Sequence, residues 1–167
     1  NTFSFTFCRL ALKIKKKIMK NYLLLLSVIT TFSLTGQNNI CSDLFISEYV
    51  EGPGNNNAIE IYNPTSFDID LSDYTINRYG NGSSSDPEVW QLSGTINSGD
   101  VVVVGNGQQD SVWVSTYWSL PVDAAFFALL DDHCSGDYSS NNTFYFNGDD
   151  AMTIEKNGNI IDVFGKV

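Results

Sequence analysis

The chain has 167 residues, about the length of one average domain, and its 19 acidic and 9 basic residues give a formal charge of −10, which disfavours binding to another polyanion such as duplex DNA. Hydrophobic residues make up 43%, aromatic residues 13% and charged residues 17% of the chain, which is too rich in core-forming side chains for a disordered acidic tail. We therefore expect a single folded domain that binds no nucleic acid.

The first part of the chain has the pattern of an export signal. Met19 and Lys20 are followed by the apolar run 22–29 and then by small and polar residues up to Gly36. A short basic start, an apolar run of about 7 to 15 residues and small residues before the exit are typical of a secretory signal peptide, whereas a membrane-spanning helix needs about 20 apolar residues. The pattern predicts a signal peptide over residues 19–36, with Gln37 as the mature terminus.

Residues 1–18 precede this signal and hold five of the nine basic residues. They are interpreted as translated upstream sequence, and an extended basic region of the signal peptide is the alternative. No acidic residue occurs before Asp43, so the chain from Gln37 onward carries three basic against 19 acidic residues, a formal charge of 3 − 19 = −16. The expected mature protein is therefore strongly acidic and meets the membrane only during export.

Past Gln37, apolar and polar residues alternate with the period of a β-strand. Ile59 and Ile61 fall on one face of their segment and Glu60 on the other. The pattern predicts about nine strands, over residues 44–50, 58–62, 68–71, 74–79, 88–92, 101–104, 143–146, 151–156 and 160–164. Turn formers separate these segments, and Asn157-Gly158 suits a type I′ hairpin turn. Short strands with turns about every 8 to 12 residues indicate an all-β sandwich or barrel.

Two segments depart from simple alternation. The four valines 101–104 include no polar residue, which predicts a strand buried on both faces. Residues 108–138 are rich in aromatic side chains and are expected to form a long connection with a short helix near residues 111–118.

Several motifs, in order along residues 44–167, resemble the lamin tail domain family. The segments ISEYVEG (46–52), with the three asparagines after it, and AIEIYNP (58–64) resemble the opening of that family, and IDLSDY (69–74), INSGDV (96–101), FNGDDA (146–151) and IDVFG (161–165) resemble its later motifs. The motif residues are Glu48, Asn63, Pro64, Asp70, Leu71, Asn147, Gly148, Asp149, Asp150 and Gly165.

The resemblance implies an immunoglobulin-like β-sandwich over residues 37–167. Together with the signal peptide it implies a bacterial protein, secreted or at the cell surface, in which this module is an accessory unit joined to nuclease, phosphatase or adhesin domains. The family pattern includes no catalytic residues and no cofactor. Sequences similar to it continue past the glycine at position 165 with a further Gly, an Asp-Pro and a Trp, so we expect the domain to be incomplete at its C-terminus and fused to further domains.

Candidate catalytic and metal-binding residues are few. His133, the single histidine, lies beside Asp131, Asp132 and Cys134, and no serine is singled out as its partner in a hydrolytic triad. We interpret it as a surface loop residue, with metal binding as the alternative. Ca²⁺ binding by one of three clusters of acidic residues is a further hypothesis, although solvated charges and turn residues explain these clusters more simply. The clusters are Asp68, Asp70 and Asp73; Asp131, Asp132 and Asp137; and the Asn147–Asp150 turn.

Cysteine and aromatic residues give two further hypotheses. Cys41 and Cys134 are the two cysteines of the expected mature chain, and export to an oxidising compartment favours a disulfide between them; the alternatives are two thiols or a metal site at Cys134 and His133. Five aromatic residues either fill the sandwich or form a sugar-stacking platform: Trp90, Trp113, Tyr117, Trp118 and Tyr138.

These features predict a secreted, non-catalytic binding or spacer module with an extracellular protein or glycan as partner. One alternative is the N-terminal fragment of an extracellular nuclease or phosphatase whose catalytic domain follows residue 167. The other is a Ca²⁺-dependent or carbohydrate-binding adhesion module.

The signal peptide gives a first testable prediction. Expressed from Met19 in a bacterial host, the chain should lose about 18 residues and leave the cytoplasm, and mass spectrometry of the secreted fraction measures its new N-terminus. Replacing Leu24 and Leu25 by arginine breaks the apolar run and should keep the chain inside. A secreted product that still begins at Met19 would contradict the predicted cleavage.

Overall fold

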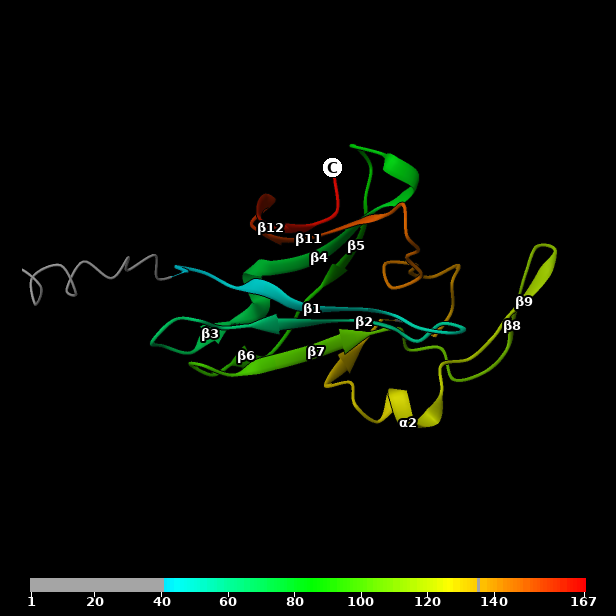
Figure 1. The fold of residues 1–167 in the computed structure, drawn as a ribbon, viewed down its shortest axis with the longest axis horizontal. Coiled ribbons are helices and arrows are strands. Elements are labelled where there is room, and N and C mark those ends of the chain that lie inside the picture. The colour runs from blue at the N-terminus through cyan, green and yellow to red at the C-terminus, as the bar shows by residue number, and fades with distance from the viewer. Residues whose placement is uncertain (1–40, 135) are drawn as a thin grey trace, which may run out of the picture. The chain divides into compact units, whose positions relative to one another are not determined.

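β-Strands dominate the computed structural model, which describes residues 41–134 and 136–167. The predicted upstream segment 1–18 and signal peptide 19–36 lie outside the described residues. Most strands belong to two four-stranded sheets, and Figure 1 shows the sheet of β4, β5, β11 and β12 above the sheet of β1, β2 and β7. The described part of the chain is therefore mostly β, as the alternation predicts.

The first sheet has the order β1-β2-β7-β10, in which β1 (Phe45–Glu51), β2 (Asn57–Tyr62) and β7 (Val101–Gly105) pair antiparallel and the short β10 (Asp132–His133) runs parallel to β7. The second sheet is antiparallel, with the order β12-β11-β4-β5, and consists of β12 (Asn159–Phe164), β11 (Ala151–Lys156), β4 (Tyr74–Tyr79) and β5 (Glu88–Gln91). Two short pairs complete the strands: β3 (Ile69–Asp70) with β6 (Thr95–Ile96), and β8 (Val112–Val114) with β9 (Tyr117–Ser119). The helical elements of the described residues are η1 (Leu71–Asp73), η2 (Gly80–Gly82) and α2 (Ala124–Phe127).

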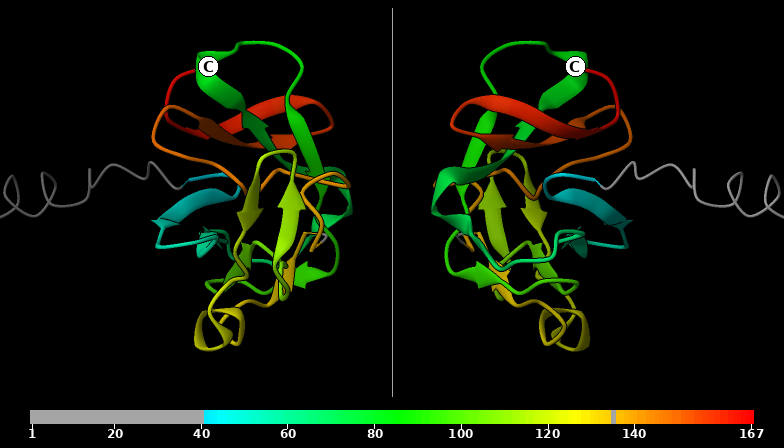
Figure 2. Two further views of the ribbon diagram at one scale, coloured as in Figure 1. Left: turned by 90° about the vertical axis from the view of Figure 1, so that its right-hand side faces the viewer. Right: turned by 90° about the vertical axis from the view of Figure 1, so that its left-hand side faces the viewer.

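Both four-stranded sheets contribute to one hydrophobic core. Ile59 and Ile61 of β2 are completely buried, and so are Met152 and Ile154 of β11 in the opposite sheet. Burial of this kind contributes roughly 1.5–3 kcal/mol for each large apolar side chain. The two packed layers, which the side views of Figure 2 show one above the other, are consistent with an immunoglobulin-like fold.

The predicted strands are confirmed except for the one over residues 143–146. β1, β2, β4, β5, β7, β11 and β12 each lie within one or two residues of the predicted segments. Asn157 and Gly158 have φ angles of 50° and 76°, as a type I′ turn requires at both central residues. The prediction that all four valines of β7 are buried on both faces is wrong, because only Val104 is fully buried and Val101 is exposed.

The predicted strand over residues 143–146 is wrong, although Phe144 and Phe146 are buried as expected. Its backbone carbonyls are engaged by side chains instead of by a neighbouring strand. Asn57 Nδ2 donates to Phe144 O and Phe146 O at 3.2 and 3.0 Å, and Arg78 Nη1 donates to Tyr145 O at 2.9 Å. The segment is therefore a buried loop whose hydrogen bonds come from distant residues.

The predicted helix near residues 111–118 is also wrong, because this stretch forms the hairpin of β8 and β9. Its two-residue turn begins at Ser115, which has a positive φ of 56°. Alternating β-branched and aromatic residues favour strands over helix, and they pair across the hairpin here. The one short α-helix of the described residues, α2, lies further along.

No disulfide joins Cys41 to Cys134 in the structure, which contradicts that prediction. Cys41 is exposed just before β1, and Cys134 is buried just after β10. These strands are the two outer strands of a four-stranded sheet and run in the same direction, so the cysteines lie at opposite edges and opposite ends of it. Three strand spacings amount to about 14 Å, beyond the roughly 7 Å limit between the Cα atoms of a disulfide.

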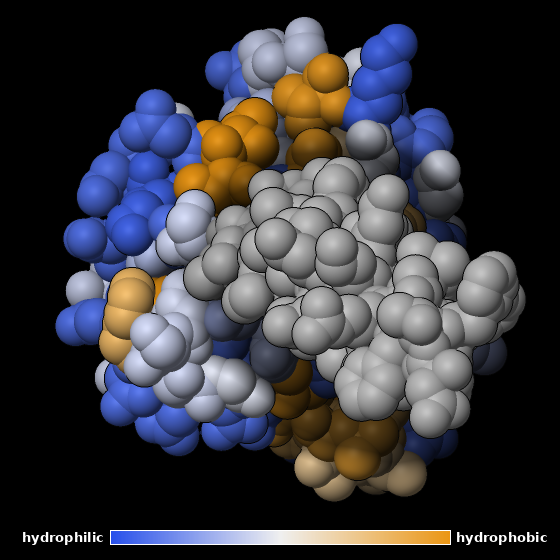
Figure 3. Space-filling view, turned by 60° about the vertical axis from the view of Figure 1, so that its left-hand side comes forward, coloured by the Kyte–Doolittle hydropathy of each residue, from blue (hydrophilic) through white to orange (hydrophobic). Residues whose placement is uncertain are grey.

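Some large apolar side chains are exposed, among them Ile160, Val163 and Phe164 of β12 and Leu129 after α2. Figure 3 shows one face, on which apolar side chains gather in separate patches between polar ones. Scattered exposed apolar residues are normal on a protein surface, and these do not by themselves mark a site.

A buried ion pair connects β4 to the loop that precedes β11. The Asp150 carboxylate is completely buried and lies 3.3 Å from Arg78 Nη1. It also accepts hydrogen bonds from the backbone N–H groups of Asn81 and Asn147, at 2.7 and 3.1 Å. Arg78 in turn donates from Nη2 to Asn142 Oδ1 at 2.6 Å, so the pair holds several segments together.

This pair gives a second prediction. Asp150→Ala should lower the free energy of unfolding by about 3–5 kcal/mol, because it leaves the Arg78 guanidinium buried without its counter-charge. Urea unfolding followed by circular dichroism measures the loss. Asp149→Ala is the matched control, since the Asp149 side chain is exposed, and it should change stability by less than about 0.5 kcal/mol. Equal losses for the two variants would contradict a dominant role for the pair.

Candidate functional site

The motif residues shape turns and do not converge on one site. Asn63 is completely buried, and its Nδ2 donates to the carbonyls of Phe67, Ile96 and Asn97 at 2.9, 3.1 and 3.1 Å. Asn63 Oδ1 accepts from Thr65 N and Oγ1 at 3.0 and 2.7 Å. Asn63 thus ties the turn after β2 to the loop after β6, while Pro64 follows it as a half-buried turn residue.

The other motif residues have comparable local roles. Asp70 Oδ1 accepts from Ser72 N at 2.9 Å at the start of η1, and this hydrogen bond lowers the pKa of the Asp70 carboxyl. Leu71 is a core residue, and Gly165 has a φ of 103°, where a Cβ atom would lie 3.0 Å from Ala151 Cα. Glu48, Asn147, Gly148 and Asp149 are exposed, and only Asp150 of the turn Asn147–Asp150 is buried.

The carboxylates near His133 bind backbone groups. Asp131 Oδ2 accepts from Val103 N, and Asp132 Oδ1 accepts from His133 N, both at 2.8 Å. The exposed His133 ring lies 4.9 Å from the Phe127 ring, and its Nδ1 lies 3.1 Å from Cys134 O. Within residues 41–134 and 136–167, no three His, Cys, Asp or Glu side chains are placed to hold a metal ion together. In the same residues no helix is long and apolar enough to cross a bilayer.

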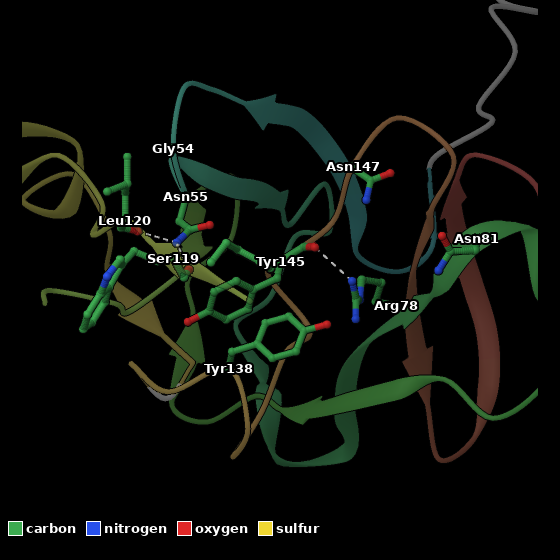
Figure 4. Close-up of a pocket in the computed structure, with 11 residues that line it drawn as sticks. Gly54, Asn55, Arg78, Asn81, Ser119, Leu120, Tyr138, Tyr145 and Asn147 are labelled. Atoms are coloured by element: carbon green, nitrogen blue, oxygen red, sulfur yellow. Dashed lines mark hydrogen bonds between the residues drawn. The ribbon is translucent and has the colours of Figure 1, made fainter. Parts of the chain in front are cut away.

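A groove of about 500 Å³ lies beside the β8–β9 hairpin and is called the aromatic groove (Figure 4). Four segments line it: the loop after β1, the end of β4 with η2, strand β9 with Leu120, and residues 138–147. Its lining residues are Gly54, Asn55, Arg78, Asn81, Tyr117, Trp118, Ser119, Leu120, Tyr138, Tyr145 and Asn147.

The hairpin holds aromatic rings in solvent at one side of this groove. Tyr117 is 54% and Trp118 60% exposed. Trp113 pairs with Trp118 across the hairpin, and their rings meet edge-on at 5.4 Å. Cross-strand aromatic pairs stabilise hairpins, so Trp113 supports Trp118 while both rings remain accessible.

Tyr138 and Tyr145 lie at the centre of the groove. Their rings meet edge-on at 5.0 Å, and Figure 4 shows Arg78, Asn81 and Asn147 to one side of them and Asn55, Ser119 and Leu120 to the other. Burial raises the pKa of the Tyr145 hydroxyl above its ordinary value, which keeps it protonated as a hydrogen-bond donor. The groove therefore has an aromatic middle and an amide-rich end.

A known protein family matches the range of the chain that the structure describes. The family model described as Lamin Tail Domain matches residues 38–167, a range that contains every described strand. The chain belongs to the lamin tail domain family. No curated protein matches it. The family resemblance drawn from the motifs is thus confirmed, while the secreted bacterial type stays a prediction.

This lamin tail domain brings together four of the five aromatic residues singled out from the sequence. Trp113, Tyr117, Trp118 and Tyr138 lie in or beside the groove, whereas Trp90 packs edge-on against Phe144 at 5.6 Å and belongs to the edge of the core. Sequence reasoning missed the polar residues of the groove, since Asn55, Arg78 and Asn81 have no local pattern that marks them.

Gln108, which the sequence analysis also missed, connects residues that line the groove through its buried side chain. Its completely buried Oε1 accepts from Asn55 Nδ2 at 3.3 Å, Ser119 Oγ at 3.0 Å and Tyr145 Oη at 2.9 Å. Its Nε2 donates to Ser119 O at 2.8 Å and to Asp110 O at 2.9 Å. One amide therefore connects three of the segments that form the groove.

The Gln108 network gives a third prediction. Gln108→Ala should lower the free energy of unfolding by about 1–3 kcal/mol or more, because it leaves buried donors without an acceptor. Urea unfolding measures the change, and Gln109→Ala is the control, since Gln109 is exposed on the next residue. If the two variants unfold at the same urea concentration, Gln108 does not have the role assigned to it.

Proposed function

We propose that this lamin tail domain is an exported, non-catalytic binding module of a larger bacterial extracellular protein, and that it holds its ligand in the aromatic groove. The observation that supports this most directly is the exposure of Tyr117 and Trp118 beside a preformed polar concavity. Aromatic side chains are enriched in binding sites because they supply a large rigid contact area.

The chemistry of the groove supports binding more than bond cleavage. Its lining offers amide, hydroxyl and aromatic groups, which hold ligands by hydrogen bonds and stacking. Of the described residues that line it, only Arg78 is charged, and its guanidinium is paired with Asp150 and does not act as a base in proteins. The groove thus lacks the paired acid and base on which most hydrolytic sites depend.

The Gln108 network supports the same proposal. Segments that are already connected before a ligand arrives lose little conformational freedom when it binds. Asn55 and Ser119 are positioned by direct hydrogen bonds, with 2.9 Å between Asn55 Nδ2 and Ser119 Oγ. Such a preformed wall suits a module that recognises one ligand on a rigid scaffold.

A fourth prediction tests this function. The fluorescently labelled chain should attach to bacterial extracellular material, and Trp118→Ala should reduce attachment about tenfold, the scale of losing one central aromatic contact. Phe67→Ala is the matched control, because Phe67 is 63% exposed and lies in the loop between β2 and β3, at the other end of the domain from β8 and β9 (Figure 1). No attachment by the unaltered chain, or attachment insensitive to Trp118→Ala, would overturn the proposal.

A further inference from the structure

The amide-rich end of the groove presents polar atoms that the protein itself does not use. The side chains of Asn81 and Asn147 are exposed, line the groove and make no hydrogen bond within residues 41–134 and 136–167. On the other side of the two tyrosines, Asn55 donates from Nδ2 to Ser119, Gln108 and the carbonyl of Leu120, so its Oδ1 is left as an acceptor. An occupant of the groove therefore meets three amide oxygens that need donors and two amide NH₂ groups that need acceptors.

The aromatic part presents flat apolar surfaces beside these amides. Tyr117 and Trp118 are exposed on β9. Figure 4 shows Tyr138 and Tyr145 between Asn55 on one side and Asn81 and Asn147 on the other. The face of an aromatic ring carries partial negative charge and attracts weakly positive C–H groups. The best occupant has an apolar C–H face for the rings and hydroxyl groups at its rim for the amides.

The charge of the domain selects against anionic occupants. The chain from Gln37 onward has a formal charge of −16. Arg78, the one cation among the described residues that line the groove, is compensated by the Asp150 carboxylate at 3.3 Å. An anionic ligand would approach a negative surface and find no uncompensated positive charge in the groove.

We infer that the aromatic groove binds neutral hexopyranose units of a glycan. The inference rests on the proposed binding function and names its ligand class. A neutral pyranose has C–H groups on its faces for Trp118 and Tyr117, and hydroxyls at its rim that both donate and accept for Asn55, Asn81 and Asn147. The volume of about 500 Å³ lies within the range of about 300–1,000 Å³ found for small-ligand sites, which suits a short stretch of glycan.

A proline-rich peptide is the main rival, because such peptides dock on aromatic-lined grooves elsewhere. A polyproline helix offers carbonyl acceptors but few donors, since proline has no backbone N–H. The unused Oδ1 atoms of Asn55, Asn81 and Asn147 would then be covered without hydrogen bonds, at a cost for each covered polar group. The donor and acceptor balance of the groove therefore favours the glycan.

Calorimetric titration tests this fifth prediction. The probes are neutral hexasaccharides of glucose, mannose and N-acetylglucosamine, a galacturonate hexasaccharide as the anionic match, and a polyproline peptide of similar length. At least one neutral probe should bind, with an affinity that changes little between about 0.05 and 0.5 M salt because no net charge is paired. Trp118→Ala and Tyr117→Ala should each weaken it about tenfold, Asn147→Ala several-fold, and Phe67→Ala not at all.

Binding of none of the neutral probes, or preference for the galacturonate or the peptide, would overturn the inference. The attachment assay separates this failure from failure of the proposed function. If attachment depends on Trp118 but survives periodate oxidation of the extracellular material, which destroys sugar diols, the domain is a binding module with a different ligand. If attachment does not depend on Trp118, both proposals fail together.

Discussion

The buried ion pair of Arg78 and Asp150 is the constraint on which both the core and the groove depend. Hydrogen bonds must offset the cost of removing a charged pair from water. Here they come from Asn81, Asn142, Asn147 and the carbonyl of Tyr145 and leave Arg78 Nε as the one polar atom of the pair without a partner among the described residues. The requirement fixes where β4 ends and how the 142–150 loop runs. The same loop carries Phe144 and Phe146 into the core and presents Tyr145 and Asn147 to the groove.

The family motif FNGDDA acquires a physical meaning from this arrangement. Asp150 is its buried acceptor, and Asp149 and Gly148 form the exposed turn that brings Asp150 into place. A second polar network, centred on Gln108, plays the corresponding role for the opposite wall, where it connects Asn55, Ser119 and Tyr145. The groove is thus held together by two buried polar networks, on a scaffold whose stability comes from the apolar residues of the two sheets.

Sequence-based predictions agree with the structure where local patterns determine an element, and they fail where distant residues determine it. Strands β2, β4 and β11 could be predicted because alternation is a local property that burial of one sheet face imposes. The prediction of a strand over residues 143–146 failed because the carbonyls of this loop accept hydrogen bonds from Asn57, Asn106 and Arg78. None of these residues is near the loop in the sequence. The prediction of a helix near residues 111–118 failed for another reason, because these residues favour strands. A positive φ at Ser115 also allows the tight turn between β8 and β9, which the aromatic content alone did not indicate.

The sequence by itself determined the family and the mostly β architecture, because turn motifs and the alternation of strands depend on residues that are close together in the sequence. It also singled out Tyr117, Trp118 and Tyr138 as aromatic candidates, without deciding whether they belong to the core or to a binding surface. Only the tertiary structure showed that these residues line a groove outside the core, and it also separated Cys41 from Cys134. Both outcomes depend on contacts between distant segments, such as Asn55 with Ser119 and Arg78 with Asp150, and a groove built from four such segments has no local pattern by which a sequence could reveal it.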